Sequence, residues 1–191
     1  MNTNRLEAFS DGVMAVALTV MVLGIQPPGG THLDALLSMA PQFLTYVLSF
    51  VYVGIYWTNH HHLLHAAERV NGKVLWANLH LLFWLTLIPL TTAWMKEHID
   101  AALPAAIYGL VLLCAAFAYY LLAHLLAGLH GHDSTLAKAI GCDLKNKISI
   151  LLYAAGIGLA FVHAWIADAL YVAVAIMWLI PERRIEKLLA H

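Results

Sequence analysis

The first apolar segment opens with Arg5-Leu6-Glu7-Ala8-Phe9-Ser10-Asp11-Gly12 and continues from Val13 to Ile25 without another charged residue. As an α-helix, residues 5–25 would rise about 30 Å, which matches the hydrocarbon core of a bilayer. Asn4 is a candidate N-cap, with Glu7 three residues on. The segment therefore predicts a transmembrane helix that carries an Arg, a Ser and an Asp near its first end.

One face of this predicted helix is a stripe of branched apolar residues. Val16, Val20 and Leu23 follow at i, i+4 and i+7, and Thr19 lies beside them. The opposite face is just as apolar and holds Met14, Leu18, Met21 and Ile25. Periodicity alone therefore leaves open which face meets a neighbouring helix, lipid or a pore, and simple helix packing is the default interpretation.

The composition sets the class of protein. Apolar residues make up 62% of the 191 residues and charged residues 11%, and the mean hydropathy is +0.76. Soluble domains are about half apolar and about a quarter charged. The chain is thus expected to be an integral membrane protein in contact with lipid. Its net charge of −1 gives no basic surface for nucleic acid.

Breaker residues divide the chain into six apolar segments, which predicts an all-α protein with six transmembrane helices in one domain, 1–191. The segments cover about 5–26, 37–62, 73–96, 101–129, 145–166 and 168–190. Pro89 predicts a kink or a break near Leu85. Ala167 and Asp168 separate the last two segments.

The basic residues predict the orientation. With both termini in the cytoplasm, nine basic residues lie on that side: Arg5, Arg69, Lys73, Lys138, Lys145, Lys147, Arg183, Arg184 and Lys187. The other side holds Lys96 with Asp34, Glu97, Asp100 and Asp168. This asymmetry follows the positive-inside rule.

Polar groups at membrane depth are functional candidates. Arg5 and Asp11 could anchor the first helix at the interface by snorkelling. Alternatively, Ser10 and Asp11 could accept hydrogen bonds from other helices. The candidate donors are Trp57, His60, His61 and Asn78.

Histidines raise two further possibilities. His61 and His65 have the i, i+4 spacing of a metal chelate, but no third ligand lies nearby in sequence, so a partly solvated, pH-sensitive patch with His60 and His62 is favoured and no metal site is expected. Haem ligation is disfavoured because the candidate ligands fall at different predicted depths. Those candidates are His80, His124 and His163.

Several motifs together resemble a known family. The run Arg5-x-x-x-Phe9-Ser10-Asp11 at the start of an apolar first helix is similar to the signature of the endosomal and lysosomal potassium-channel family in its prokaryotic form. Supporting motifs are Tyr56-Trp57-Thr58-Asn59-His60-His61, Asn78 and Leu87-Ile88-Pro89-Leu90. The resemblance covers the layout of the whole chain, and its specific motifs lie in the first half.

This resemblance implies a homotetrameric potassium channel in the plasma membrane of a prokaryote, with potassium as the permeant ion and no cofactor. Four first helices would surround an axis, and rings of Val16, Val20 and Leu23 would form a hydrophobic constriction, with Thr19 between them. Relatives more often carry Ile or Leu where this chain has Val16, so the narrowest ring could be wider here. The motif residues would be structural: Arg5, Phe9, Ser10, Asp11, Trp57, His60, His61 and Asn78.

Other functions are less well supported. The chain has neither hydrolase, zinc-protease nor phosphate-loop motifs, so an enzyme is not expected, and it lacks the Thr-Val-Gly-Tyr-Gly filter of other potassium channels. The alternative is a small secondary transporter or proton-linked carrier using Asp11 and the histidines. A carrier usually shows internal repeats and ionisable groups at mid-bilayer, and residues 13–25 contain none. Cys114 and Cys142 are expected as free thiols.

Overall fold

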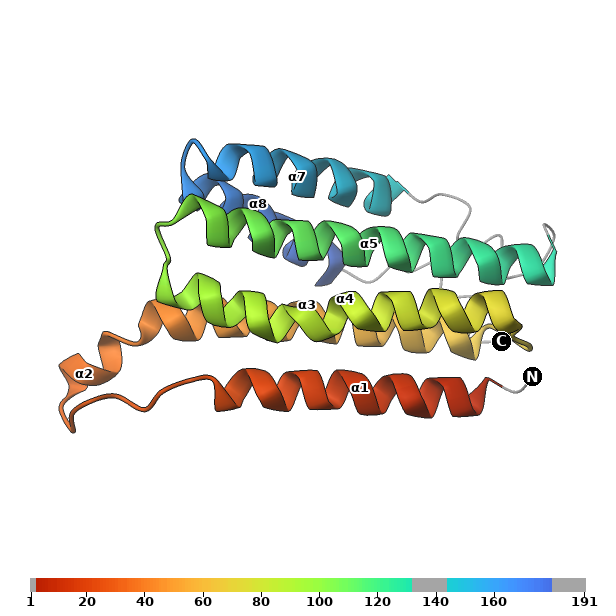
Figure 1. The fold of residues 1–191 in the computed structure, drawn as a ribbon, viewed down its shortest axis with the longest axis horizontal. Coiled ribbons are helices and arrows are strands. Elements are labelled where there is room, and N and C mark those ends of the chain that lie inside the picture. Colours follow the sequence, from red (N-terminus) through yellow and green to blue (C-terminus); the bar gives the residue numbers. More distant parts are fainter. Residues whose placement is uncertain (1–2, 132–143, 180–191) are drawn as a thin grey trace.

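The structure is a computed structural model that describes residues 3–131 and 144–179. These residues form an all-helical bundle, as the composition predicts (Figure 1). The helices are α1 (Asn4–Leu23), α2 (Leu33–Leu37), α3 (Ala40–His65), α4 (Gly72–Glu97), α5 (Ala102–His130), α7 (Leu144–Ala160) and α8 (Ala164–Leu179).

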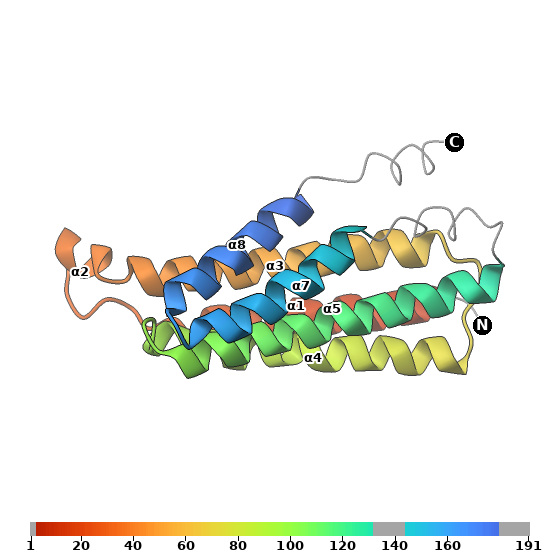
Figure 2. The same cartoon turned by 90° about the horizontal axis from the view of Figure 1, so that it is seen from above.

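The first helix lies on one side of the bundle. It packs against α3 and α4, whereas α5, α7 and α8 lie on the other side of the α3–α4 layer (Figures 1 and 2). The start of α1 and the loop between α3 and α4 lie at one end of the bundle. The loop between α4 and α5 and the turn between α7 and α8 lie at the other, together with the end of α1. The bundle therefore covers only one flank of α1.

Three helices among the described residues are long and apolar enough to cross a bilayer, namely α1, α4 and α5. The helix α8 is apolar but shorter, at 16 residues within the described part of the chain. The predicted continuation of this segment to residue 190, and the thiol of Cys142, lie outside the described residues. The helical, membrane-spanning character of the chain follows from these segments.

Two local predictions were wrong, and the structure narrows a third. The helix α1 begins at Asn4, so Thr3 and not Asn4 occupies the N-cap position. Of the kink or break predicted near Leu85, the break is absent: α4 continues through Pro89 to Glu97, because a proline removes only one backbone hydrogen bond from an otherwise packed helix. The last turn lies at residues 161–163 and not at Ala167, which is fully buried inside α8. No Gly or Pro marks that turn in the sequence.

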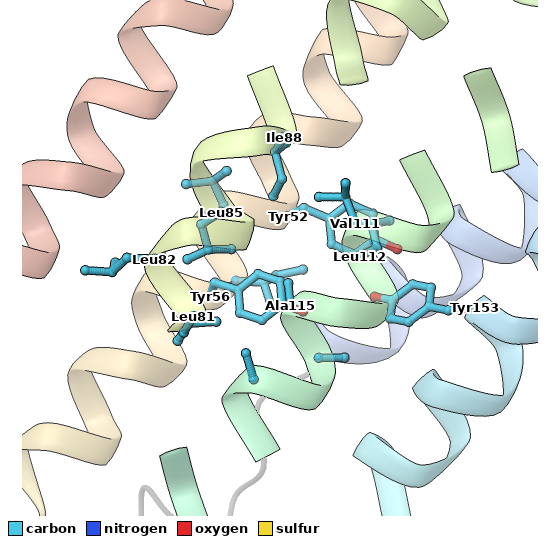
Figure 3. Packing of buried hydrophobic residues seen from close by; sticks show 14 of the residues in the cluster. Tyr52, Tyr56, Leu81, Leu82, Leu85, Ile88, Val111, Leu112, Ala115 and Tyr153 are labelled. Atoms are coloured by element: carbon cyan, nitrogen blue, oxygen red, sulfur yellow. The ribbon is translucent and has the colours of Figure 1, made fainter. Parts of the chain in front are cut away.

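The core lies between α3, α4, α5, α7 and α8, and Figure 3 shows large side chains of α3, α4, α5 and α7 interdigitating in part of it. Tyrosines tie its far side together: the Tyr52 hydroxyl donates to the carbonyl of Tyr171 at 2.5 Å, and the Tyr171 hydroxyl donates to the carbonyl of Ala105 at 3.1 Å. The Tyr171 ring lies against two glycines, Gly109 on α5 and Gly156 on α7. These contacts join α3 to α5, α7 and α8 on the side of the bundle away from α1.

Candidate functional site

The two faces of α1 have opposite environments within the subunit. The face toward α3 and α4 is buried and consists of Leu6, Ser10, Met14, Ala17 and Met21. The predicted apolar stripe lies on the other side: Val16 is 61% exposed, Val20 49% and Leu23 79%. Thr19 is also exposed, and its hydroxyl donates to the Val16 carbonyl of its own helix at 2.8 Å. The subunit alone therefore leaves this stripe without a packing partner.

An open groove runs beside this stripe. Its walls are formed by α1 and by the part of α4 around Pro89, and its lining is almost entirely apolar. The lining residues are Ala8, Phe9, Gly12, Val13, Val16, Ala17, Val20, Thr86 and Pro89. An apolar groove next to an exposed apolar stripe is a surface on which another helix can pack.

A buried chain of hydrogen bonds joins three helices behind the stripe. The amide Nδ2 of Asn78 on α4 donates to Ser10 Oγ on α1 at 2.9 Å, and Ser10 Oγ donates to the Leu6 carbonyl at 2.8 Å. On its other side, Asn78 Oδ1 pairs with His60 Nε2 on α3 at 2.7 Å. Because the side chains of Ser10, His60 and Asn78 are all fully buried, these bonds replace contacts with water that the bundle excludes.

The donor and acceptor roles in these hydrogen bonds determine which ring nitrogen of His60 carries the proton. The Asn78 amide already uses its NH₂ group on Ser10, so its oxygen must accept, and His60 Nε2 must carry the proton. His60 Nδ1 is then an acceptor, and it has no hydrogen-bond partner among the described residues. A neutral histidine with a donating Nε2 thus completes the link between α1, α3 and α4.

A second, more exposed pair of contacts joins α1 to α3. Trp57 Nε1 donates to Asp11 Oδ1 at 2.9 Å, and His61 Nδ1 lies 2.7 Å from Glu7 Oε1. Glu7 and Asp11 are four residues apart on α1, as are Trp57 and His61 on α3, so the two antiparallel helices bring matching positions together. The part played by Glu7 was missed because its position also fits a capping box.

The remaining motif residues face outward. The Arg5 side chain is exposed and forms neither a hydrogen bond nor an ion pair with the described part of the chain, and Phe9 is 53% exposed at the edge of the groove. The structure therefore brings Ser10 and Asp11 together with Trp57, His60 and Asn78. Arg5 and Phe9 are left free to meet groups outside the subunit.

The other histidines do not converge on a site. The rings of His61 and His65 stack at 5.9 Å, but across residues 3–131 and 144–179 no three metal-binding side chains come together. His80 Nε2 accepts a hydrogen bond from Trp84 of its own helix at 2.9 Å, and His124 is exposed on α5.

The contact between Trp57 and Asp11 provides a test of the anchoring of α1. We expect Trp57→Phe and Asp11→Ala each to lower the free energy of unfolding by about 1 kcal/mol, and to show a coupling of about 0.5–1 kcal/mol in a double-mutant cycle, because both remove the same partly exposed bond. Thermal or denaturant unfolding of the purified protein in detergent measures this. Trp57→Phe combined with Asp34→Asn, at the far end of the molecule, should be additive. Equal coupling in both cycles would contradict the assignment.

Comparisons with known proteins agree with this architecture. A family model described as endosomal/lysosomal potassium channel TMEM175 matches residues 5–89. A protein named as a potassium channel from Chryseobacterium sp. (strain P1-3) is 48% identical, covering 98% of this chain and 97% of its own. One from Streptomyces collinus (strain DSM 40733 / Tue 365) is 35% identical, covering 85% and 84%. The crystal structure of a lysosomal potassium-selective channel TMEM175 homolog from Chamaesiphon minutus superposes with a TM-score of 0.80 at 28% identity, over 93% of this chain and 96% of that one.

Proposed function

This chain belongs to the TMEM175 potassium-channel family, and we propose that it is a modestly potassium-selective cation channel whose pore is lined by α1 from four identical subunits. The observation that carries the proposal is the exposed apolar stripe of α1, Val16, Val20 and Leu23, on a helix whose opposite face is anchored in the subunit. Relatives named as potassium channels, matched over nearly the whole of both chains, support the potassium-channel part of this proposal.

The proposed assembly is supported by the geometry of one subunit. A single α1 cannot enclose a pore, so several copies must place their exposed faces around a common axis, and closed cyclic symmetry achieves this with one type of contact. The groove between α1 and α4 is the surface on which a neighbouring copy can pack. Four copies are the number that the family resemblance implies.

The constriction works by excluding water. Rings of Val16, Val20 and Leu23 offer no polar group to replace the hydration shell of an ion, so a narrow ring dewets and blocks conduction until it widens. The Thr19 hydroxyl, exposed beside the stripe, is the polar group nearest to these rings on α1. Selectivity then depends on how easily an ion sheds water, which favours K⁺ over Na⁺ only modestly.

The buried hydrogen bonds of α1 serve this constriction indirectly. Ser10 and Asp11 hold α1 against α3 and α4, and this fixes which face of the helix turns outward. These residues need not touch the ion. With the amino terminus in the cytoplasm of a prokaryotic cell, the start of α1 is the inner end of the pore and Leu23 lies toward the outer end.

Potassium flux through the purified protein in liposomes tests the proposal. We expect Val16→Ala, Val20→Ala and Leu23→Ala to change the flux, or the preference for K⁺ over Na⁺, by about tenfold, which corresponds to about 1.4 kcal/mol in the barrier. Each substitution removes methyl groups from a ring of four and so widens the constriction. The measurement is K⁺ efflux under a K⁺ gradient, repeated with Na⁺.

Val22→Ala is the matched control. Val22 is 47% exposed, almost the same as Val20, but lies two positions along α1 and so on a different side of the helix. It should leave flux and ion preference nearly unchanged. Equal effects at Val20 and Val22 would show that the stripe does not line the pathway. An absence of flux in wild type, with intact oligomers, would favour the carrier alternative.

A further inference from the structure

Lys96 is a buried cation at the end of α1 remote from Ser10 and Asp11. It lies in the last turn of α4 and is only 7% exposed. Its Nζ donates to the carbonyl of Gly24, the residue that follows the end of α1 at Leu23. Figure 1 shows the end of α4 and the end of α1 at the same end of the bundle.

The charge of Lys96 is balanced by the helix end itself. The one ion pair among the described residues is that of His61 and Glu7, so no described carboxylate neutralises Lys96. The last turn of α1 contains no basic residue of its own. Its carbonyl end carries a partial negative charge and unpaired acceptors, so a cation there is stabilised. The last turn of α1 has no basic residue, and Lys96 of α4 places a cation there instead.

Among the described residues, polar side-chain contacts link α1 to other helices at its two ends and not between them. The inner end is held through Glu7, Ser10 and Asp11. From Gly12 to Leu23, the side-chain hydrogen bond that the structure describes is that of Thr19 to its own helix, so apolar packing alone links this part to α3 and α4. Apolar contacts allow small sliding and tilting movements more readily than a directed bond does. At the outer end of α1, the polar side-chain contact to another helix that the structure describes is that of Lys96.

We propose that Lys96 is a positioning residue that holds the outer end of the pore helix by its charge, and thereby sets the width of the ring at Leu23. This inference rests on the proposed function, because it assumes that α1 lines the pore. When the charge is removed, the outer end of α1 is released, Leu23 moves away from the axis, and the outer constriction widens.

The test compares three replacements of Lys96 in liposomes. We expect Lys96→Met to raise K⁺ flux about fivefold and to lower the preference for K⁺ over Na⁺, because the interaction of the cation with the helix end is lost. Lys96→Gln keeps a donor without the charge and should lie close to Lys96→Met. Lys96→Arg keeps the charge and should behave like wild type. Lys73→Met, at the exposed start of the same helix, is the matched control and should not change ion preference.

A second measurement follows the helix end directly. Leu23→Cys in a Cys114→Ala, Cys142→Ala background places a thiol on the outer ring, and its rate of modification by a methanethiosulfonate reagent should rise with Lys96→Met or Lys96→Gln and not with Lys96→Arg. Equal rates and equal flux in all Lys96 variants would overturn the inference. If wild type passes no K⁺, the proposed function fails, and the thiol rates still decide whether Lys96 holds α1.

Discussion

Gly156→Ala and Gly109→Ala are expected to lower the free energy of unfolding by about 2 kcal/mol and about 3 kcal/mol, because both overpack the Tyr171 ring. A β-carbon at Gly156 would lie 2.6 Å from Tyr171 Cε1, and one at Gly109 would overlap the Tyr171 hydroxyl and lie 2.6 Å from Cζ. The ring cannot move aside, since it is fully buried between α5, α7 and α8. Unfolding of the purified protein in detergent, followed by circular dichroism, measures both losses.

The same helix supplies the control. Gly158 is exposed two residues after Gly156, and a β-carbon there meets nothing within 4 Å. Gly158→Ala should be neutral or stabilising by up to about 1 kcal/mol, since alanine favours a helix. Tyr171→Phe should recover more of the loss in Gly109→Ala than in Gly156→Ala, because the hydroxyl is the nearest atom to the β-carbon at Gly109, whereas at Gly156 the nearest atom is the ring carbon Cε1 and the hydroxyl lies 3.3 Å away. Equal losses for Gly156→Ala and Gly158→Ala would contradict this packing.

Asn78→Leu should be comparably damaging, lowering the free energy of unfolding by about 2–4 kcal/mol. The substitution leaves the Nε2–H group of His60 without an acceptor and removes the donor to Ser10 Oγ, and all three side chains are fully buried. Because these hydrogen bonds also hold α1 against α3 and α4, we expect the K⁺ flux of the variant protein that still folds to change as well. Unfolding in detergent and liposome flux of the same preparation measure the two effects.

Two variants sharpen this prediction. Asn59→Leu changes an amide whose hydrogen bond, within the described part of the chain, is to the Ile55 carbonyl of its own helix at 2.8 Å, and it should cost less than about 1 kcal/mol. His60→Leu combined with Asn78→Leu removes both partners of the 2.7 Å bond between α3 and α4, so the pair should be less destabilising than the sum of the single changes. Strictly additive losses would show that the bond between His60 and Asn78 does not couple α3 to α4.

The sequence pattern predicted which polar residues matter, but it did not predict which of them pair with each other. Ser10, Asp11, Trp57, His60 and Asn78 stand out because polar groups in apolar segments need partners. Their pairing does not follow from spacing: His60 bonds to Asn78 and not to α1, whereas His61 meets Glu7. Pairing depends on how α3 and α4 are rotated about their axes, and the apolar residues around these groups permit several rotations. Lys96 is a similar case, since its partner is a backbone carbonyl that no side-chain pattern reveals.

Some helix boundaries can likewise be predicted from the sequence, and others cannot. The linkers after α1 and between α3 and α4 carry breaker or polar residues and are visible in the sequence. The short helix α2 and the turn at residues 161–163 are not, because no Gly or Pro marks the turn and α2 spans only five residues. Where local signals are weak, tertiary packing decides: α8 begins at Ala164, and this places Ala167 and Tyr171 one helical turn apart on its fully buried face.

The amino-acid sequence by itself determined that this chain is a helical membrane protein, since its apolar content and segment lengths admit little else. It also placed Val16, Val20 and Leu23 on one face of the first helix, because the helical period does so in any environment. Only the tertiary structure decided that this face is the exposed one. Both faces of α1 are equally apolar, and the hydrogen bond of Ser10 to Asn78 and that of Asp11 to Trp57 turn one face inward and leave the other exposed.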